Sequence, residues 1–528
     1  MKNDLEFELN GLEQMLNLGQ FSEAYAEANG LLNKLMKNQM PNSSYHICLF
    51  HLAGIFIDIG QMQPNRKSVE IGVCLLEDHA DMIKESCSIS RFFYFLANGK
   101  SYLLKNSGIR SSEDEAFKVS AIQQVGEVIS LYWYSMEQSR KEHGAESLDI
   151  KVNLANCLRG QYRVVEALFF YDQVNYAGLD IPQSWVNRSE ALQTLSQMSD
   201  SMSIEMVRQG RKGYEKVLNS REIPPQWRSV YREKINKHNI IIEEHGGIPY
   251  GDAHEEMETE KEFKALSPYR RWCIEHQFAL SEHALYCKCV AADSDNLTII
   301  PSSGVCGEFI PAMEAVLNRL KSEFSFATLL LYEFCHVEKF SQSETPFSEL
   351  FNQELLGVDV EKIRTSFRLC FGILDKIAIA VSKVFNLEPV KGNTYFQSFW
   401  NLKNEHRREI FEKANNKGLI ALYGVASDLN FSVGGQLSLY KQWRNYLEHS
   451  FLVVYRGEDT PQDLYGTYTF LPDVLYVQED NFVSSLKHLL QLTRASIFYF
   501  TFAIREEGLK LAKVNIDSVR PTITVDWM

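Results

Sequence analysis

Apolar residues recur at helical spacing along most of the chain, and short polar breaks separate the runs. From Met1 to about His245 this pattern predicts one helix after another. Longer amphipathic runs follow at Glu308–Phe334, Val360–Phe385, Gln436–Tyr455 and Asn481–Lys513. The spacing therefore predicts an all-α fold.

A repeat is visible in the first half of the chain. The run Val152–Leu158 is echoed by Val186–Leu192, and 186 − 152 = 34 is the tetratricopeptide period. Gly-Gln followed by a large apolar residue recurs from Gly19, Gly60 and Gly160, where a small residue eases the turn between paired helices. Stacked helical pairs leave a concave face. We therefore predict a TPR-like helical repeat solenoid over residues 1–245, used for recognition or assembly rather than chemistry.

The helical pattern stops after His245, where glycines and a run of glutamates are typical of a solvated linker. We place an acidic linker at residues 246–266 and a second helical domain, with an extended C-terminal tail, at residues 267–528. Four long helices form this second bundle. Two insertions are expected in it, at Ser341–Asn352 and Arg456–Asp480, and alternation over Tyr465–Val477 favours a small hairpin in the second.

The third long helix, expected over Gln436–Tyr455, has two distinct faces. Its apolar stripe consists of Tyr440, Trp443, Leu447, Phe451 and Val454. Asn445, His449 and Arg456 lie roughly opposite that stripe, and the long side chain of Arg444 can reach the polar face. A plain alternative is a solvated Arg444–Glu448 pair beside an ordinary surface histidine.

The motif Arg444-Asn445-x-x-x-His449 resembles the Arg-x-x-x-x-His signature of the HEPN superfamily, named for higher-eukaryote and prokaryote nucleotide binding. Further blocks resemble a bacterial HEPN subfamily with a tetratricopeptide-like region in front: Leu374–Ala378, Tyr395–Trp400, Ala421–Tyr423 with Asp428, and Leu492–Tyr499. The resemblance covers roughly Ser267–Lys513. It implies a HEPN-type helical bundle, and active members of the superfamily are metal-independent endoribonucleases.

The resemblance also implies roles for the motif. His449 would move a proton, since histidine titrates near neutral pH, and Arg444 would hold the scissile phosphate through a bidentate contact. Asn445 would orient either partner, and Glu448 completes the catalytic group. We expect Lys441 and Arg456 to bind substrate.

A wider basic pocket could include Lys403, His406, Arg407 and Arg408, unless these residues are ordinary solvated surface. Because one histidine does not easily serve as both acid and base, and because HEPN bundles pair, we expect a homodimer through the C-terminal half. RNA cleavage would then leave a 2′,3′-cyclic phosphate and a 5′-hydroxyl.

Two functions of different class stay open. In the first, the protein is an endoribonuclease, a toxin or anti-phage effector, whose repeats sense a trigger or hold a protein partner. In the second, it is a catalytically silent HEPN/TPR scaffold that dimerises and binds protein or nucleotide. A nucleotide-binding regulator has less support: Gly99-Lys100-Ser101 looks like the end of a phosphate loop, but position 94, where that loop needs glycine, is Tyr.

Composition narrows these expectations. The 528 residues carry a net charge of −14, which argues against a protein coated with nucleic acid but not against one small basic pocket. Ten cysteines and the lack of a long apolar span lead us to expect a reduced, cytoplasmic protein without membrane contact. We expect no cofactor and no metal: His276, His283, Cys287, Cys289 and Cys306 are dense, but Cys287 and Cys289 are too close together for paired zinc ligands.

Overall fold

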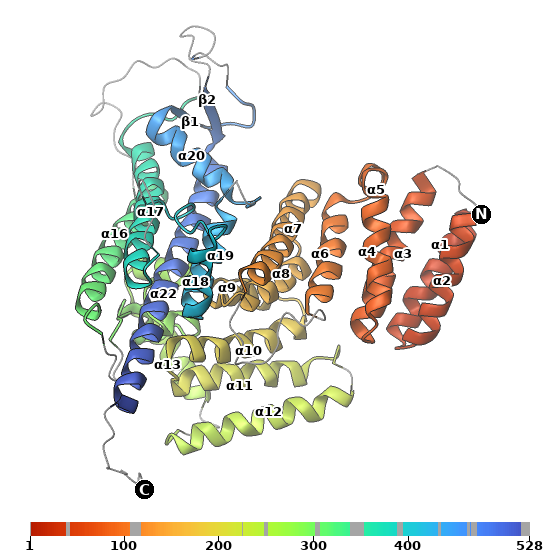
Figure 1. The fold of residues 1–528 in the computed structure, drawn as a ribbon, viewed down its shortest axis with the longest axis horizontal. Helices are drawn as coiled ribbons and strands as arrows, with labels where there is room; N and C mark the ends of the chain where they lie inside the picture. Colours follow the sequence, from red (N-terminus) through yellow and green to blue (C-terminus); the bar gives the residue numbers. More distant parts are fainter. Residues whose placement is uncertain are drawn as a thin grey trace. The chain divides into compact units, whose positions relative to one another are not determined.

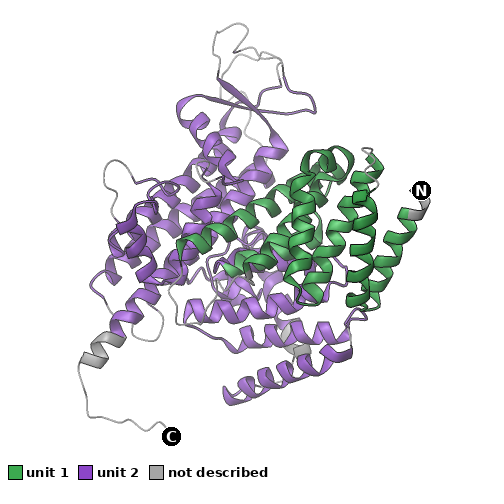
Figure 2. Cartoon of the chain, turned by 45° about the vertical axis from the view of Figure 1, so that its right-hand side comes forward, with its two compact units in different colours: residues 1–160 green, residues 161–528 purple. Residues whose placement is uncertain are grey.

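The computed structural model describes most of the chain. The described residues are 2–37, 43–105, 118–223, 225–247, 252–300, 307–337, 353–387, 394–430, 434–461, 465 and 473–518. They divide into two compact units, residues 1–160 and residues 161–528 (Figure 2). The predicted insertion Ser341–Asn352 and all but the first residue of the tail Ser518–Met528 lie outside the described residues.

Unit 1 is entirely helical where it is described. Its helices are α1 (Lys2–Asn17), α2 (Phe21–Lys37), α3 (Ser43–Met62), α4 (Arg66–Asp78), α5 (Ala80–Ser86), α6 (Ile89–Lys105), α7 (Val119–His143) and α8 (Leu148–Gly160). Neighbours along the chain pack together, most closely α3 with α4 and α6 with α7 (Figure 1). A side chain at Gly60 would place its Cβ 2.3 Å from Val69, so glycine lets α3 and α4 approach closely.

Helix α3 forms the centre of unit 1. By length and composition it could cross a membrane, but most of its residues are buried within the protein, as is typical of a core helix. No other described helix meets that test. Leu49, Leu52, Phe56 and Ile57 are almost fully buried against the neighbouring helices.

Unit 2 contains the remaining elements. Its first helices are α9 (Val164–Asn175), α10 (Pro182–Ser199), α11 (Ile204–Asn219), α12 (Pro225–Glu244), α13 (Asp252–Ala265), α14 (Pro268–Glu275), the 3₁₀ turn η1 (His283–Leu285) and α15 (Val290–Asp293). The others are α16 (Ile310–His336), α17 (Val358–Val384), α18 (Glu405–Ala414), α19 (Lys417–Asp428), α20 (Ser438–His449) and α22 (Glu479–Ser518), with strands β1 (Phe451–Tyr455) and β2 (Val474–Gln478).

The predicted all-α fold, with successive helices followed by a bundle of long helices, is confirmed. The two echoed runs fall on α8 and α10, each from the fifth residue of its helix. Long helices α16, α17 and α22 pack side by side in unit 2 (Figure 1) and lie close to the predicted ranges.

The compact units divide within the predicted repeat region, so α9–α12 share unit 2 with the bundle. Residues 252–265, predicted as linker, form α13 because glutamate and lysine favour helices and pair four residues apart, as Glu260 and Lys264 do at 2.6 Å. The division into a repeat domain and a HEPN-type domain stays a prediction.

The small sheet differs from the expected hairpin. Strands β1 and β2 pair in parallel, with Phe451 opposite Val474 and Tyr455 opposite Gln478. Parallel strands need a crossover between them, so a hairpin prediction from alternation alone is wrong for residues 474–477. Most of residues 465–473 lie outside the described part of the chain.

Buried charges bind α9 to the bundle within unit 2. Arg163, just before α9, is fully buried, and its guanidinium lies 2.6 Å from Glu166 and 2.8 Å from Asp428 of α19. Tyr499 of α22 donates to Glu166 over 3.2 Å. The Asp428 and Tyr499 side chains, which are part of the blocks that resemble HEPN proteins, therefore have a structural role here.

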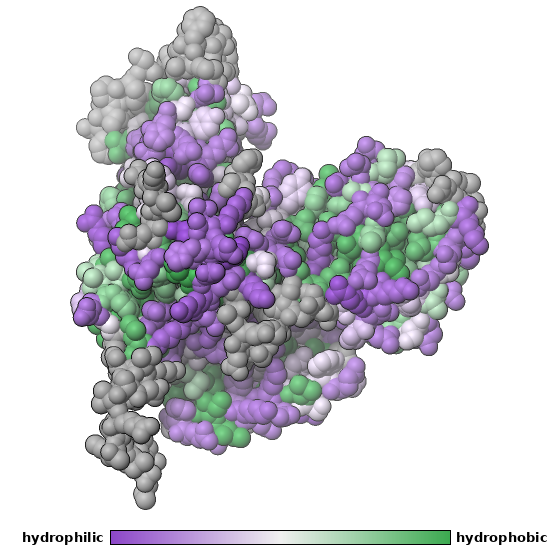
Figure 3. All heavy atoms as spheres, in the orientation of Figure 1, coloured by the Kyte–Doolittle hydropathy of each residue, from purple (hydrophilic) through white to green (hydrophobic). Residues whose placement is uncertain are grey.

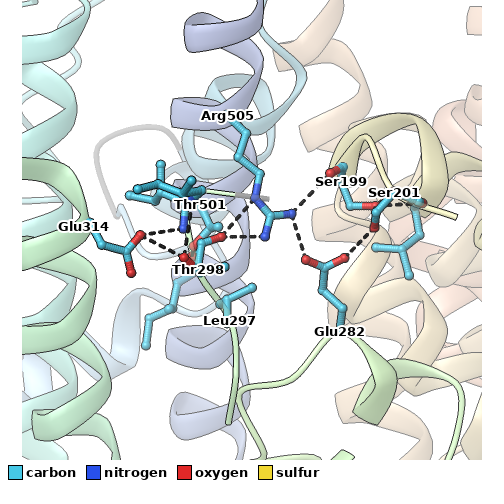
Figure 4. Close-up of polar contacts among 12 residues, drawn as sticks. Ser199, Ser201, Glu282, Leu297, Thr298, Glu314, Thr501 and Arg505 are labelled. Atoms are coloured by element: carbon cyan, nitrogen blue, oxygen red, sulfur yellow. Dashed lines mark hydrogen bonds and ion pairs between the residues drawn. The ribbon is translucent and has the colours of Figure 1, made fainter. Parts of the chain in front are cut away.

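A second polar cluster fixes α22 further along its length (Figure 4). Arg505 donates to the carbonyl oxygens of Ser199 and Thr298 and pairs with Glu282 at 2.7 Å. Glu282 also accepts from Ser201, while Glu314 of α16 accepts from the backbone N–H of Ile299. One long helix thus joins α10, the loop around residue 298 and the turn η1.

Candidate active site

The motif helix is shorter than the sequence pattern indicates. Helix α20 ends at His449, and the next residues, Phe451–Tyr455, form strand β1. The prediction of one helix to Tyr455 is wrong because aromatic and β-branched residues fit a strand and find a partner in β2. Ser450, between the two, caps the helix through its N–H to Tyr446 and donates its hydroxyl to Asp473.

The apolar face of α20 is anchored in the bundle as expected. Trp443 stacks on Phe482 of α22 with ring centroids 5.6 Å apart and an interplanar angle of 6°. Tyr440 packs against Phe367 of α17, and its hydroxyl lies 2.9 Å from Nδ1 of His488. This packing fixes the rotation of α20 and so decides where its polar residues point.

Arg444 and Glu448, one turn apart on α20, both turn toward α17. Arg444 lies 3.8 Å from Asp375, and Glu448 lies 3.5 Å from Arg368. Glu448 follows Arg444 on α20, whereas its partner Arg368 precedes Asp375 on α17. The two helices therefore run antiparallel. Arg368 also donates to the backbone carbonyl of Leu447 over 2.8 Å, which satisfies one free carbonyl near the end of α20.

Asp375 is a site residue that the motif did not reveal. Its Oδ1 accepts the backbone N–H of Phe396 over 2.8 Å, while its other oxygen faces Arg444. Burial raises the pKa of Asp375, and the hydrogen bond from Phe396 and the charges of Arg444 and Lys441 act against that rise. The sequence could have indicated Asp375 only as a single carboxylate within the apolar run of α17, in a block that resembles HEPN proteins.

An aromatic ring completes the surroundings of Arg444. The guanidinium carbon lies 5.7 Å from the ring centroid of Tyr395, within the range of a cation–π contact. Tyr395 is 40% exposed, so the ring and the guanidinium both meet solvent. Sequence reasoning placed Tyr395 only within a block of resemblance.

Asn445 and His449 lie one turn apart on the exposed side of α20. Arg444 donates from one of its terminal nitrogens to Oδ1 of Asn445 over 3.3 Å, which brings two motif residues into contact. The imidazole of His449 makes no hydrogen bond or ion pair with any residue that the structure describes. Hydrophilic residues gather on the visible surface over α20 (Figure 3). His449 is therefore available to exchange a proton with a ligand.

The two predicted substrate-binding cations differ. Lys441 is half-buried and contributes positive charge at Asp375. Arg456, beyond strand β1, is held by Glu479 through contacts of 2.7 and 3.0 Å, and this hydrogen bonding raises its pKa. A substrate phosphate at Arg456 would have to compete with that carboxylate.

The wider basic pocket needs one correction. Arg407 is only 5% exposed, and its guanidinium donates to the carbonyls of Leu387, Phe399 and Trp400. Arg407 thus stabilises the loop before α18 and is not a solvated cation. Lys403 and His406 are exposed, and Arg408 is half-buried 3.8 Å from Glu405.

No group of three or more metal-ligating side chains gathers among the residues described here. Cys289 lies 3.8 Å from Nδ1 of His283, and hydrogen bonds from Cys287 and His283 lower the pKa of the Cys289 thiol. Cys306 lies outside the described residues.

Helix α20 thus packs its aromatic side chains into a helical bundle and leaves Asn445 and His449 exposed on its other side. Residues 305–507 match the family model described as LA2681-like HEPN, so this part of the chain is similar to HEPN domains. HEPN domains generally occur in ribonucleases, so the match supports an enzymatic role without specifying the reaction. No curated protein matches the chain, and no solved structure matches it either.

Proposed function

We propose that this protein is a metal-independent endoribonuclease whose active site is built on α20. The observation that carries the proposal is the exposed, unpartnered imidazole of His449, among the described residues, beside an arginine and an asparagine that already contact each other. The match of residues 305–507 to a HEPN family supports it.

RNA supplies its own nucleophile, so the protein needs to move protons and stabilise charge. His449 accepts the proton of the 2′-hydroxyl, whose oxygen attacks the adjacent phosphorus while the bond to the 5′-oxygen breaks. The leaving 5′-oxygen receives a proton from a protonated histidine. The products are a 2′,3′-cyclic phosphate and a 5′-hydroxyl, and no further reactant is required.

Arg444 stabilises the phosphate as negative charge builds up. Its distance of 3.8 Å from Asp375 is longer than a hydrogen bond, so part of its guanidinium remains free for a bidentate phosphate contact. Asn445 holds the guanidinium near the exposed face, and Lys441 adds positive charge behind it. Glu448, paired with Arg368, positions the last turn of α20 rather than touching the substrate.

A single histidine per chain favours a composite site. Two HEPN domains in a homodimer would place a second His449 across one cleft, so that one imidazole acts as base and the other as acid. We place this activity in the cytoplasm, in a toxin or anti-phage effector whose repeats hold a trigger or a protein partner.

The decisive experiment is cleavage of total RNA by the purified full-length protein in the presence of EDTA. Wild type should cleave and leave cyclic phosphate ends, whereas Arg444→Ala and His449→Ala should be inactive. His143→Ala removes an exposed histidine from the last turn of α7 and should leave cleavage unchanged. Equal cleavage by wild type and His449→Ala would refute the proposal, and light scattering on the same samples tests the dimer.

A silent scaffold is the second candidate, and one observation favours it. The contacts of Arg444 with Asp375 and Tyr395 are also those of an arginine that only holds two helices together. Expression in a bacterial host separates the two functions. Growth arrest that His449→Ala abolishes supports the nuclease, while dimerisation without arrest or cleavage supports the scaffold.

A further inference from the structure

Two cysteines separated by one residue lie in the turn between η1 and α15 of unit 2. The backbone N–H of Cys287 donates to the carbonyl of His283 over 2.7 Å, and the N–H of Cys289 donates to Sγ of Cys287 over 3.3 Å. The two thiols also hydrogen-bond each other. Both side chains are half-buried, whereas Cys273, earlier in the same segment, is buried. The fold therefore holds two thiols in contact where a small solute can reach them.

Cys289 also faces a group that can take its proton. Nδ1 of His283 lies 3.8 Å from Sγ of Cys289. Hydrogen bonds from Cys287 and His283 lower the pKa of Cys289, and the hydrogen bond to Cys289 raises the pKa of His283. A thiolate beside an imidazolium is the nucleophilic form of cysteine. The contacts thus prepare Cys289 for attack, with the thiol of Cys287 next to it.

Other cysteines of the chain have different surroundings. Burial raises the pKa of four of them, which keeps their thiols protonated: Cys48, Cys87, Cys273 and Cys370. Cys74 of α4 is exposed, but no described histidine or cysteine hydrogen-bonds it. Cys74 is therefore a natural reference for an accessible thiol without an activating partner.

The charges around the pair favour an uncharged reagent. Glu262 accepts the backbone N–H of the residue after Cys289 over 3.1 Å. Besides the hydrogen bond to Cys289, the charge of Glu205 on α11 raises the pKa of both Cys287 and His283. These carboxylates repel an anionic oxidant such as a glutathione-type disulfide, whereas a hydroperoxide carries no charge.

We propose that Cys287 and Cys289 are a redox-active pair, in which Cys289 reacts with a hydroperoxide and Cys287 then closes a disulfide. A reactive, accessible thiolate next to a second thiol is the arrangement that such chemistry requires. The inference stands apart from the proposed ribonuclease function, because its readout is thiol chemistry and involves no RNA.

The reaction with hydrogen peroxide balances without a further reactant. The Cys289 sulfur attacks one peroxide oxygen, so that an S–O bond forms and the O–O bond breaks, and the departing hydroxide takes the proton of His283 to become water. The Cys287 sulfur then attacks the sulfenic sulfur. The S–S bond forms, the S–O bond breaks, and the hydroxyl leaves as water with the proton of Cys287. Two thiols are oxidised to one disulfide, and one peroxide is reduced to two waters.

The test exposes the reduced full-length protein to hydrogen peroxide and maps its tryptic peptides by mass spectrometry. Trypsin cuts after Lys288, between the two cysteines, so their disulfide leaves residues 272–288 joined to residues 289–319. Wild type should give this joined pair of peptides, and reduction should separate them.

Substitutions identify the bond and the order of the steps. Cys289→Ser should leave Cys287 reduced, whereas Cys287→Ser should stop Cys289 at the sulfenic acid, which dimedone traps. The joined peptides should be lost in both variants. Cys74→Ser, which removes an exposed cysteine from α4, should give them as wild type does.

Alkylation by iodoacetamide at pH 5.5 tests the thiolate itself. An ordinary thiol with a pKa of about 8.5 is only about 0.1% ionised at that pH, so Cys289 should react about tenfold faster than Cys74. The lower nucleophilicity of an acidic thiolate keeps the difference this small. His283→Gln should reduce the rate at Cys289 to about that at Cys74.

Three results would overturn the proposal. The first is that peroxide yields no joined peptides in wild type, and the second is that Cys289 is alkylated no faster than Cys74. The third is a metal assay that finds about one zinc ion per chain, lost with Cys289→Ser, since the thiols would then be metal ligands.

Discussion

Arg163 and Arg444 each face an aspartate on a neighbouring helix of unit 2, yet their surroundings differ. The side chain of Arg163 is 0% exposed and 2.8 Å from Asp428, while that of Arg444 is 24% exposed and 3.8 Å from Asp375. A closed, short pair has no capacity for a ligand and can only hold elements together. An open, long pair keeps donors for a ligand, and we therefore propose that the same residue types serve the fold at Arg163 and catalysis at Arg444.

Replacing Arg163, the fully buried arginine, should have the largest effect on stability. Arg163→Met leaves Glu166 and Asp428 buried without their cation, and we expect the free energy of unfolding to fall by about 3–5 kcal/mol. Urea denaturation measures this loss. Arg319→Met, which removes the exposed arginine of a pair with Glu323 on α16, should cost less than about 1 kcal/mol. Similar losses for both variants would show that Arg163 is not a structural anchor.

Replacing His449, the exposed histidine of the motif, should affect activity but not stability. His449→Ala removes the proposed proton-transferring group, and we expect single-turnover RNA cleavage to fall about 10³-fold, which corresponds to about 4 kcal/mol of barrier. The melting temperature should stay at the wild-type value because His449 is exposed and makes no hydrogen bond or ion pair with the described residues. A large drop in melting temperature would show that His449, like Arg163, stabilises the fold.

Arg444→Lys sharpens the comparison further. Lysine keeps the charge near Asp375 but loses the planar fork that binds phosphate in a bidentate way, so cleavage should fall about 10- to 100-fold. The free energy of unfolding should change by less than about 1 kcal/mol, since the pair is partly exposed and long. Retained cleavage would mean that Arg444 supplies only charge. A loss of stability would mean that Arg444 mainly holds α17 and α20 together.

The smallest effect is expected at Asp58 in unit 1. Burial and the charge of Glu13 raise the pKa of Asp58 to about 6, above its ordinary value of about 4. Stability from the protonated acid is therefore present at low pH and lost as the pH rises from about 4 through 6. Above pH 7 Asp58→Asn should stabilise α3 by about 1–2 kcal/mol, discounted for partial exposure, while near pH 4 it should have little effect.

Amide hydrogen exchange of α3 peptides, followed at both pH values, measures this difference. Asp78→Asn, on the exposed side of α4, is the matched control and should change exchange at neither pH. If the amides of α3 exchanged faster in Asp58→Asn than in wild type at pH 7, the ionised carboxylate of Asp58 would be stabilising rather than destabilising.

Much of the fold could be predicted from the sequence because helical periodicity is local. The apolar spacing along Val360–Phe385 and Asn481–Lys513 predicted α17 and α22 within a few residues. Periodicity could not predict where α20 ends, because the strand after His449 depends on a partner strand that begins 25 residues later (474 − 449 = 25).

The site was predictable only in part, for a similar reason. The motif placed Arg444, Asn445 and His449 on one helix, but Asp375, Tyr395 and Arg368 come from distant segments that only the fold brings together. The burial of Arg407 was missed because its partners are backbone carbonyls, which leave no trace in a pattern of side chains.

Helix α22 has a mechanical consequence. With 40 residues it is a rod about 60 Å long. Its first residue follows β2, which pairs with the strand after His449, and further along it is fastened to Glu166 by Tyr499 and to Glu282 by Arg505. A rotation of about 3° about its midpoint would displace each end by about 1.5 Å. Since a misplacement of about 1 Å can reduce catalysis about 10²-fold, the proposed activity of His449 requires α22 to be held as firmly as these contacts hold it.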